Sequence, residues 1–327
     1  MATRRMLGEF DIIGRYFSPP AAGAVLGVGD DAAIVRARDG AELVVTTDLL
    51  VSGRHFRPDA DPAQLGHKAL AVNLSDIAAM GAAPRWATLA LAVPKADARW
   101  LAAFSRGFMH LARRHDVDLI GGDTTRGPLA ICVQVIGEVP AGKALRRDGA
   151  RPGDDVWVSG RLGDAGLVLA AMAGQVLLSR REQARLAPRL HVPTPRIELG
   201  IALRGVAHSA IDISDGLLAD LGHICERSRL AAVVEMELIP SSATLNRHLP
   251  RAAARTALLA GGDDYELCFT AGRRERERIV RLARRLHVAL TRIGTIVPLH
   301  RKTATVTVLG NHGKALMLTR RGFDHFA

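Results

Sequence analysis

Apolar runs along this chain repeatedly lead into glycine, serine or threonine and then into aspartate. Five segments share this pattern: 24–31 (AVLGVGDD), 43–48 (LVVTTD), 117–123 (VDLIGGD), 210–215 (AIDISD) and 258–264 (LLAGGDD). β-Branched and leucine-rich runs favour strands, and Gly, Ser and Asp favour turns. Each segment therefore predicts a strand that ends by delivering a carboxylate into a turn. Residues 131–139 and 156–160 predict two further strands.

Apolar residues at helical spacing lie between these strands. The pattern predicts helices over 63–80, 97–115, 164–174, 195–206, 216–228 and 273–286. Strands and helices mix without strict β-α-β alternation, so we expect an α+β or mixed α/β fold rather than a Rossmann sheet. The glycine- and proline-containing stretch 140–153 is the best linker candidate, and it predicts two domains, 1–147 and 148–327.

The composition is that of an ordinary globular protein, with 48% hydrophobic and 24% charged residues in 327. The longest apolar stretches are shorter than the ~18 residues of a membrane-spanning helix. The acidic residues Glu9 and Asp11 interrupt what could be a leader, so we expect a cytoplasmic protein without a membrane partner. The three cysteines, Cys132, Cys225 and Cys268, are far apart in apolar surroundings and predict buried reduced thiols.

The net charge of +11 is concentrated at one end of the chain. Residues 271–327 hold 13 Lys+Arg and 3 Asp+Glu, a net of +10, which leaves +1 for the rest. The densest run begins the helix predicted over 273–286, where the bases form a solvated face. No recognition motif or aromatic platform accompanies them, so a solvated surface is favoured over a nucleic-acid site.

The aspartates suggest a magnesium and phosphate site. Mg²⁺ takes oxygen ligands, commonly one or two carboxylates together with phosphate oxygens and water. Glycines beside the aspartates, such as Gly27, Gly122 and Gly261, would let backbone N–H groups approach a phosphate. The motifs of P-loop proteins, protein kinases, zincins and α/β-hydrolases are absent.

The ordered set of segments resembles the bacterial thiamine-monophosphate kinase family. This family is part of the superfamily of aminoimidazole ribonucleotide synthetase, selenophosphate synthetase and the hydrogenase-maturation dehydratase. The matching segments run in order from GEFDIIGRYF (8–17) to GFDHF (322–326), and include GVGDDAA (27–33), TTDLLVSGRHF (46–56), HKALAVNLSDIAAMGA (67–82), LIGGDTTRGP (119–128), LRRDGARPGD (145–154), PTPR (193–196), DISDGL (212–217) and GGDDYEL (261–267). The resemblance implies a homodimer with an N-terminal sheet domain, which binds ATP and Mg²⁺ and forms the dimer, and a C-terminal α/β domain.

The resemblance also implies the reaction and its residues. The reaction is the last step of thiamine diphosphate synthesis, in which the γ-phosphoryl group of ATP passes in line to thiamine monophosphate with the help of several Mg²⁺ ions. The implied metal ligands are Asp30, Thr46, Thr47, Asp48, Asp76, Asp123, Asp212 and Asp215. ATP would contact Gly122, Asp123, Arg147 and Ser214, and thiamine phosphate would contact His55, Glu266 and Phe323.

The implied chemistry agrees with the residue types. The acceptor phosphate is already ionised at neutral pH, so positioning and charge neutralisation suffice without a strong general base. A guanidinium such as that of Arg147 suits a phosphate, and an aromatic ring such as that of Phe323 suits the cationic thiazolium. One departure is Asp263, where the family commonly has Glu.

Two alternatives stay open on the sequence alone. The first is another ATP-dependent reaction of the superfamily, such as amide or formyl activation with cyclisation, or selenophosphate formation. Selenophosphate synthetases use a cysteine or selenocysteine in an N-terminal loop, whereas the first cysteine here is Cys132. The second is a nucleic-acid-binding module that uses the basic C-terminal region.

Overall fold

The protein is described from a computed structural model, which covers residues 8–299, 306–310, 313–316 and 322. The chain divides into two compact units, Met1–Ile77 with Ala82–Gly142 and Ala78–Gly81 with Lys143–Ala327. The division after Gly142 falls inside the stretch 140–153 that the sequence marks as a linker. Each unit is built around its own mixed sheet.

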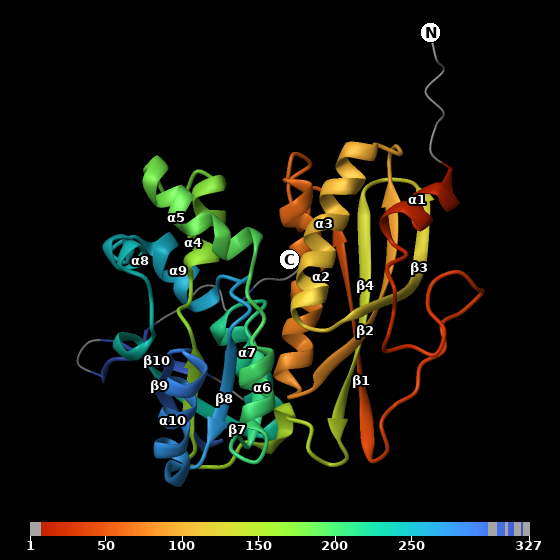
Figure 1. Ribbon diagram of the computed structural model, residues 1–327. Helices are drawn as coiled ribbons and strands as arrows, with labels where there is room; N and C mark the ends of the chain where they lie inside the picture. The colour runs from red at the N-terminus through yellow and green to blue at the C-terminus, as the bar shows by residue number, and fades with distance from the viewer. Residues whose placement is uncertain (1–7, 300–305, 311–312, 317–321, 323–327) are drawn as a thin grey trace. The chain divides into compact units, whose positions relative to one another are not determined.

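The first unit carries a four-stranded sheet with the order β1-β4-β2-β3 in its described residues. Its strands are β1 (Ala41–Val51), β2 (Ala83–Val93), β3 (Asp118–Arg126) and β4 (Ala130–Pro140). Strand β4 pairs antiparallel with β1 and with β2, whereas β2 and β3 are parallel. The helices are α1 (Glu9–Tyr16), α2 (Pro62–Ala79) and α3 (Ala98–Arg114). Helices α2 and α3 lie along one face of this sheet (Figure 1).

Glycine allows α2 and α3 to pack in direct backbone contact. A Cβ atom at Gly66 of α2 would overlap with the carbonyl of Phe104 in α3, and one at Gly107 of α3 would overlap with the carbonyl of Ala63. Interiors are close-packed, so an added methyl group at either position has no space and would have to separate the helices.

The two faces of this sheet differ in burial. Ile131, Val133 and Val135 on β4 are buried on the helix side. On β1 the alternate residues Leu43, Val45 and Leu49 are 47%, 55% and 54% exposed. We call the face that carries these three residues the open face; successive side chains of a strand point to opposite faces.

The second unit carries a six-stranded sheet with the order β10-β7-β9-β5-β8-β6 in its described residues. These strands are β5 (Asp155–Ser159), β6 (Ser209–Asp212), β7 (Leu230–Glu235), β8 (Leu267–Ala271), β9 (Leu290–Pro298) and β10 (Val306–Leu309). The helices are α4 (Asp164–Met172), α5 (Arg180–His191), α6 (Ile197–Leu203), α7 (Leu217–Ser228), α8 (Ala243–His248), α9 (Ala252–Ala260) and α10 (Arg276–Leu286).

Both faces of the second sheet are apolar. Val156 and Val158 of β5 belong to a buried cluster with Leu221 of α7 and Leu258 of α9. Trp157, between them on β5, stacks on Phe269 of β8, and alternation places this pair on the other face. Helices therefore cover the sheet on both sides, as expected for an α/β domain.

Much of the predicted secondary structure is confirmed. The strands expected over 43–48, 117–123, 131–139 and 156–160 are β1, β3, β4 and β5, and β6 covers the start of 210–215. However, β1 and β3 continue past Asp48 and Asp123, so these two carboxylates lie within strands and not in the predicted turns. The helices expected over 63–80, 97–115, 164–174, 195–206, 216–228 and 273–286 correspond to α2, α3, α4, α6, α7 and α10.

Two predicted strands are wrong. Residues 24–31 form only isolated bridges, such as Leu26 with Ile34. Residues 258–260 end helix α9, and 261–266 form a loop that leads into β8. An apolar run of this length does not distinguish a buried strand from the end of a buried helix.

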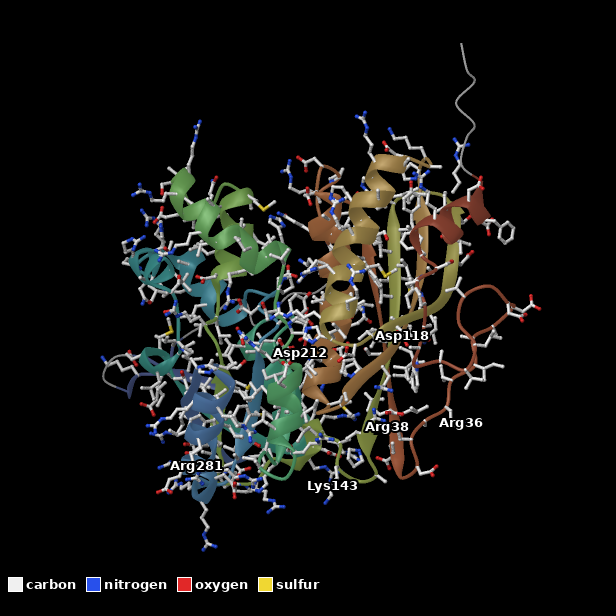
Figure 2. The ribbon with its side chains drawn as sticks, viewed as in Figure 1. Arg36, Arg38, Asp118, Lys143, Asp212 and Arg281 are labelled. Atoms are coloured by element: carbon white, nitrogen blue, oxygen red, sulfur yellow. The ribbon has the colours of Figure 1, made fainter. Side chains whose placement is uncertain are left out.

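The basic run near the C-terminus is a charged helical face, as predicted. On α10, Ile279 and Leu282 are buried. Arg281, which Figure 2 labels on this helix, is 68% exposed and pairs with Glu277 at 3.7 Å. Cys225 and Cys268 are buried free thiols, while Cys132 is only half-buried. Within the described residues, no helix is long and apolar enough to span a membrane.

Candidate active site

Three predicted metal ligands meet where β1 faces α2. The Thr46 hydroxyl donates a hydrogen bond to Asp76 Oδ2 over 2.5 Å. Asp48 follows two residues after Thr46 and points to the same side of the strand. The sequence TTD therefore brings a hydroxyl and a carboxylate to a carboxylate that the helix supplies.

The electrostatics of this cluster favour a bound cation. Burial, reinforced by the negative charge of Asp76, raises the pKa of Asp48 to about 7. Two carboxylates placed this closely repel each other, and a divalent cation between them would remove the repulsion.

Thr47 belongs to the opposite face of the sheet. Its hydroxyl accepts a hydrogen bond from Gln134 Nε2 at 3.4 Å, and Gln134 is its register partner on β4. The side chain of Thr47 therefore points away from Asp48, and only its backbone carbonyl could serve the same ion as Asp48.

Gly122 and Asp123 lie on β3, the far edge of this sheet. A Cβ atom at Gly122 would overlap with the Leu89 carbonyl, and φ is +144°, so this position requires glycine. The Asp123 carboxylate accepts a hydrogen bond from the Thr124 N–H at 2.8 Å. Residues paired across neighbouring strands point to the same face of a sheet. Asp123 is linked to Leu49 by such pairs through Ala90 and Cys132, so the Asp123 side chain points to the open face.

Asp48 and Asp123 are therefore separated by two strands and by the sheet itself. Three strand spacings amount to about 14 Å, whereas a Mg²⁺–oxygen bond is about 2.1 Å. One ion cannot take both carboxylates of one chain. The predicted ligands of this unit thus divide into a helix-side group (Thr46, Asp48 and Asp76) and an open-face group (Thr47 and Asp123).

Asp30 lies in the segment before β1, and His55 lies in the loop that follows β1. Asp30 is exposed and accepts a hydrogen bond from the Asp31 N–H at 2.9 Å. His55 Nδ1 accepts the backbone N–H of Val51 at 2.9 Å. A nitrogen that accepts carries no hydrogen, so the neutral ring carries its hydrogen on Nε2, a donor suited to a phosphate oxygen.

In the second unit, Asp212, Ser214 and Asp215 lie at the end of β6 and in the turn after it. The turn is held by Asp220 of α7, whose Oδ2 accepts the N–H groups of Ser214, Asp215 and Gly216 at 3.1, 3.1 and 3.0 Å. Burial and the charge of Asp215 raise the pKa of Asp220 to about 7. Asp220 fixes the two residues that the family resemblance assigns to ATP and metal.

The loop 261–265 runs beside this turn. Asp263 donates its N–H to the Ser214 carbonyl at 2.9 Å, and Tyr265 donates its N–H to the Ile213 carbonyl at 2.8 Å. The Tyr265 hydroxyl donates to Asp263 Oδ1 at 3.1 Å. The shorter carboxylate at position 263 is thus used within its own loop.

Glu266 is buried and surrounded by donors. Its Oε2 accepts from Ser159 Oγ at 2.5 Å and from Arg196 Nε at 2.6 Å. Its Oε1 accepts from Arg196 and, at 3.2 Å, from Arg189. A substrate contact by Glu266 would require one of these bonds to open.

Arg147 lies in a 3₁₀ turn, Arg147–Gly149, with an exposed side chain. Its neighbour Arg146 is engaged in a bidentate pair with Asp148, at 2.9 and 2.6 Å. Arg147 is thus the better placed of the two to bind a phosphate. Phe323 lies outside the described residues.

Sequence reasoning missed three residues of this region. Asp220 lies in the segment DISDGLLAD. Its spacing from the turn is that of a residue in the first turn of a helix that accepts the N–H groups before it, and this spacing could have revealed its role. Arg196 is in the matched PTPR segment, but no partner for it could be inferred. Arg189 is on α5, an Arg-rich helix containing Pro188 that the apolar pattern did not reveal.

The described residues contain no group of three or more His, Cys, Asp or Glu side chains arranged as a metal site.

Each of the two units matches a known domain family. Residues 29–139 match the N-terminal domain of AIR synthase related proteins, and 151–307 match the C-terminal domain. A thiamine-monophosphate kinase of Escherichia coli (strain K12) is 45% identical over 327 residues, which cover 98% of each chain.

Solved structures agree with the sequence relatives. The crystal structure of thiamine-monophosphate kinase from Stenotrophomonas maltophilia K279a matches with a TM-score of 0.82 and 48% identity, and covers 93% of this chain and 95% of its own. AaThiL complexed with AMPPCP and TMP matches with a TM-score of 0.73 and 31% identity over 100% of both chains.

Proposed function

Because this chain belongs to the thiamine-monophosphate kinase family, with its two AIR synthase related domains, we propose that it phosphorylates thiamine monophosphate with ATP. The products are thiamine diphosphate and ADP. The observation that carries the proposal beyond family membership is the cluster of Thr46, Asp48 and Asp76, which presents only oxygen donors.

The donor set fits Mg²⁺. Hard divalent cations prefer carboxylate and hydroxyl oxygens, and the described cluster contains no sulfur or imidazole donor that would favour zinc. We assign the helix-side group to one ion. Thr47 and Asp123 share the open face but lie three strand spacings apart, so we assign them to separate ions. Asp30, Asp212 and Asp215 are further proposed ligands. When bound, Mg²⁺ neutralises the charge that builds up on the phosphates during transfer.

The chain's own residues bind and orient the two phosphates. Gly122 is assigned to the ATP phosphates, Ser214 lies in a turn fixed by Asp220, and Arg147 presents an exposed guanidinium to the same phosphates. His55 donates Nε2–H to the phosphate of thiamine monophosphate. The acceptor oxygen is already ionised, so no residue has to remove a proton from it.

Glu266 and Phe323 stay predictions for the thiamine end of the substrate. The bonds from Arg189 and Arg196 favour a role for Glu266 in holding β8 to the loop of Arg196. A direct contact would use Oε1, where the bond from Arg189 is the longest of the set.

We propose that two copies associate through the open face. Leu43, Val45 and Leu49 form an exposed apolar stripe on an edge strand, and such a stripe favours a protein interface. Thr47 and Asp123 lie on the same face, so the second copy would pack beside two proposed ligands. A cytoplasmic location stays a prediction.

The reaction is tested with purified full-length protein, ATP, Mg²⁺ and thiamine monophosphate, with thiamine diphosphate measured as its fluorescent thiochrome derivative. Formation of thiamine diphosphate in step with ADP supports the proposal. ATP hydrolysis without thiamine diphosphate would favour another reaction of the superfamily. Binding of DNA or RNA at nanomolar concentration and physiological salt would revive the nucleic-acid alternative.

A further inference from the structure

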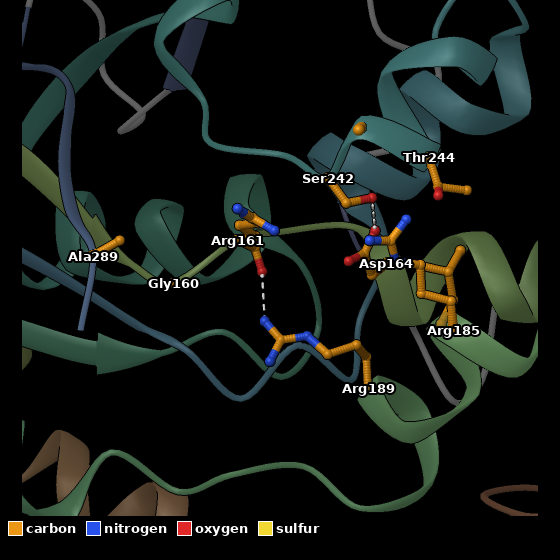
Figure 3. Close-up of a pocket in the computed structure, with 10 residues that line it drawn as sticks. Gly160, Arg161, Asp164, Arg185, Arg189, Ser242, Thr244 and Ala289 are labelled. Carbon is orange, nitrogen blue, oxygen red and sulfur yellow. Dashed lines mark hydrogen bonds between the residues drawn. The ribbon is translucent and has the colours of Figure 1, made fainter. Parts of the chain in front are cut away.

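A cavity of about 450 Å³ lies within the second unit, between the turn after β5, helix α5 and the start of α8. Figure 3 shows its lining, in which Arg161, Arg185 and Arg189 stand around Asp164 and Ser242. The volume is that of a site for a small metabolite. Apart from Arg189, which bonds to Glu266, none of these residues is among those that the proposed kinase function uses.

The cavity is built from side chains held at both ends of α5. At the start of α5, Glu182 caps the helix and pairs with Arg247 of α8 at 3.0 Å. At its end, Arg189 donates to the Arg161 carbonyl at 3.4 Å and to Glu266 at 3.2 Å. These bonds hold α5 and the neighbouring segments in place without a ligand, so less conformational entropy is lost when a ligand binds.

The floor of the cavity is the pair formed by Ser242 and Asp164. Ser242 Oγ donates to Asp164 Oδ1 at 2.6 Å and accepts the N–H of Leu245, so it also caps α8. Asp164 is 4% exposed. Burial raises its pKa, and the charges of Arg189, Arg161 and Arg185 act in the opposite direction.

The cavity has more positive than negative charge, because three arginines line it and Asp164 is the one acidic residue among the described residues of its lining. Arg189 is shared with Glu266, and Asp164 is one carboxylate among three guanidinium groups. The guanidinium groups of Arg161 and Arg185 form no hydrogen bond with another residue that the structure describes. Both guanidinium groups line the same cavity, where they can donate to a ligand.

We propose that this cavity binds a small phosphate monoester whose phosphate lies between Arg161 and Arg185. Paired guanidinium groups match the geometry of phosphate oxygens, and two of them suit a dianion better than a single carboxylate. The remaining volume accommodates an organic group, and a hydroxyl on that group donates to the buried Asp164. The inference goes beyond the kinase reaction and does not rest on it.

Isothermal titration calorimetry on the full-length chain tests this site. The protein is first saturated with Mg²⁺ and a non-hydrolysable ATP analogue, so that phosphate binding at the ATP site is blocked. Ribose 5-phosphate, inorganic phosphate and ribose are then titrated separately. We expect saturable binding of one ribose 5-phosphate per chain and no binding of ribose.

The two phosphate probes distinguish the source of the anion. Tighter binding of ribose 5-phosphate identifies an organic ester as the ligand. Equal binding of inorganic phosphate supports the same anion site with free phosphate as its occupant. Binding of neutral ribose as tight as that of its phosphate would overturn the proposal, because the arginines would then be irrelevant.

Matched variants connect the binding to the cavity. The double substitution Arg161→Ala with Arg185→Ala should weaken binding of ribose 5-phosphate by about tenfold or more. The control is Arg180→Ala with Arg181→Ala, which removes the same charge from exposed positions at the start of α5, outside the cavity. Equal binding by the two double variants would refute the assignment.

Thermal denaturation of both double variants shows whether they are folded; all four arginines are exposed, so we expect melting temperatures near that of the unsubstituted protein. The thiochrome assay on the unsubstituted protein tests the kinase proposal separately. Failure of one proposal therefore leaves the other standing.

Discussion

Asp48 on β1 and Asp76 on α2 lie close enough for the charge of Asp76 to help burial raise the pKa of Asp48 to about 7. Asp48 therefore stays protonated in the folded chain up to about pH 7, whereas in the unfolded chain it ionises near the ordinary aspartate pKa of 3.8. The cluster is unfavourable for the empty protein at neutral pH and becomes favourable when a cation fills it.

Asp48→Asn should lower kinase activity at least about a hundredfold, because a metal carboxylate supplies several kcal/mol of charge stabilisation. Without Mg²⁺, the same substitution should raise the melting temperature at pH 8. The folded pKa is the higher one, so the wild type loses stability as pH rises from about 4 to about 7, and the variant lacks this loss.

Both effects are measured by thiochrome assay and by thermal denaturation between pH 5 and 8. Asp39→Asn, an exposed carboxylate in the loop before β1, is the control. A variant with full activity would remove Asp48 from the metal site, and an unchanged pH dependence of melting would contradict the raised pKa.

Asp220→Ala should reduce the free energy of unfolding by roughly 2–4 kcal/mol, because three backbone N–H groups lose their acceptor. Asp220→Asn retains an amide oxygen that can accept them and should recover most of the stability at pH 8. Urea denaturation measures both. Equal loss in the two variants would show that the charge, rather than the acceptor, holds the turn.

Arg147→Ala should raise the KM for ATP about tenfold or more, the cost of one charge-assisted phosphate contact. Arg146→Ala is the matched control, since Asp148 already engages that guanidinium. Steady-state kinetics with varied ATP compare the two. A larger effect from the Arg146 substitution would reverse the assignment.

Leu49→Asp should convert the proposed dimer into a monomer, because it places a charge in the apolar stripe of the open face. Leu177→Asp provides the control, since Leu177 is 90% exposed in a loop of the second unit. Light scattering coupled to size-exclusion chromatography gives the masses. A monomeric wild type, or a dimeric Leu49→Asp protein, would argue against this interface.

The sequence predicted strands and helices well where the spacing of apolar residues and the length of the apolar run indicated the same element. Strand β1 was expected from its β-branched run, and its period of two already implies that Thr46 and Asp48 share a face while Thr47 does not. Strand β8 was missed because Leu267–Ala271 is a short, fully buried run without alternation. Helix α5 was missed because charged residues and Pro188 obscure its apolar positions.

The arrangement of the site depended on sheet order, which local patterns do not encode. Asp48 and Asp123 end similar sequence motifs, each an apolar run followed by Thr or Gly, and the sequence assigned both to one magnesium and phosphate site. The order β1-β4-β2-β3 places them at opposite edges instead. The partners of Glu266 were equally hidden, since Ser159, Arg189 and Arg196 come from three separate segments.

The glycine contact between α2 and α3 makes the position of Asp76 depend on two residues that are not themselves proposed ligands. Asp76 projects from α2, and the place of α2 is set by how closely it can approach α3 at Gly66 and Gly107. A single methyl group at either glycine would push the helix outward and carry the carboxylate with it. Activity could then be lost with every site residue intact, through a change that looks conservative in the sequence.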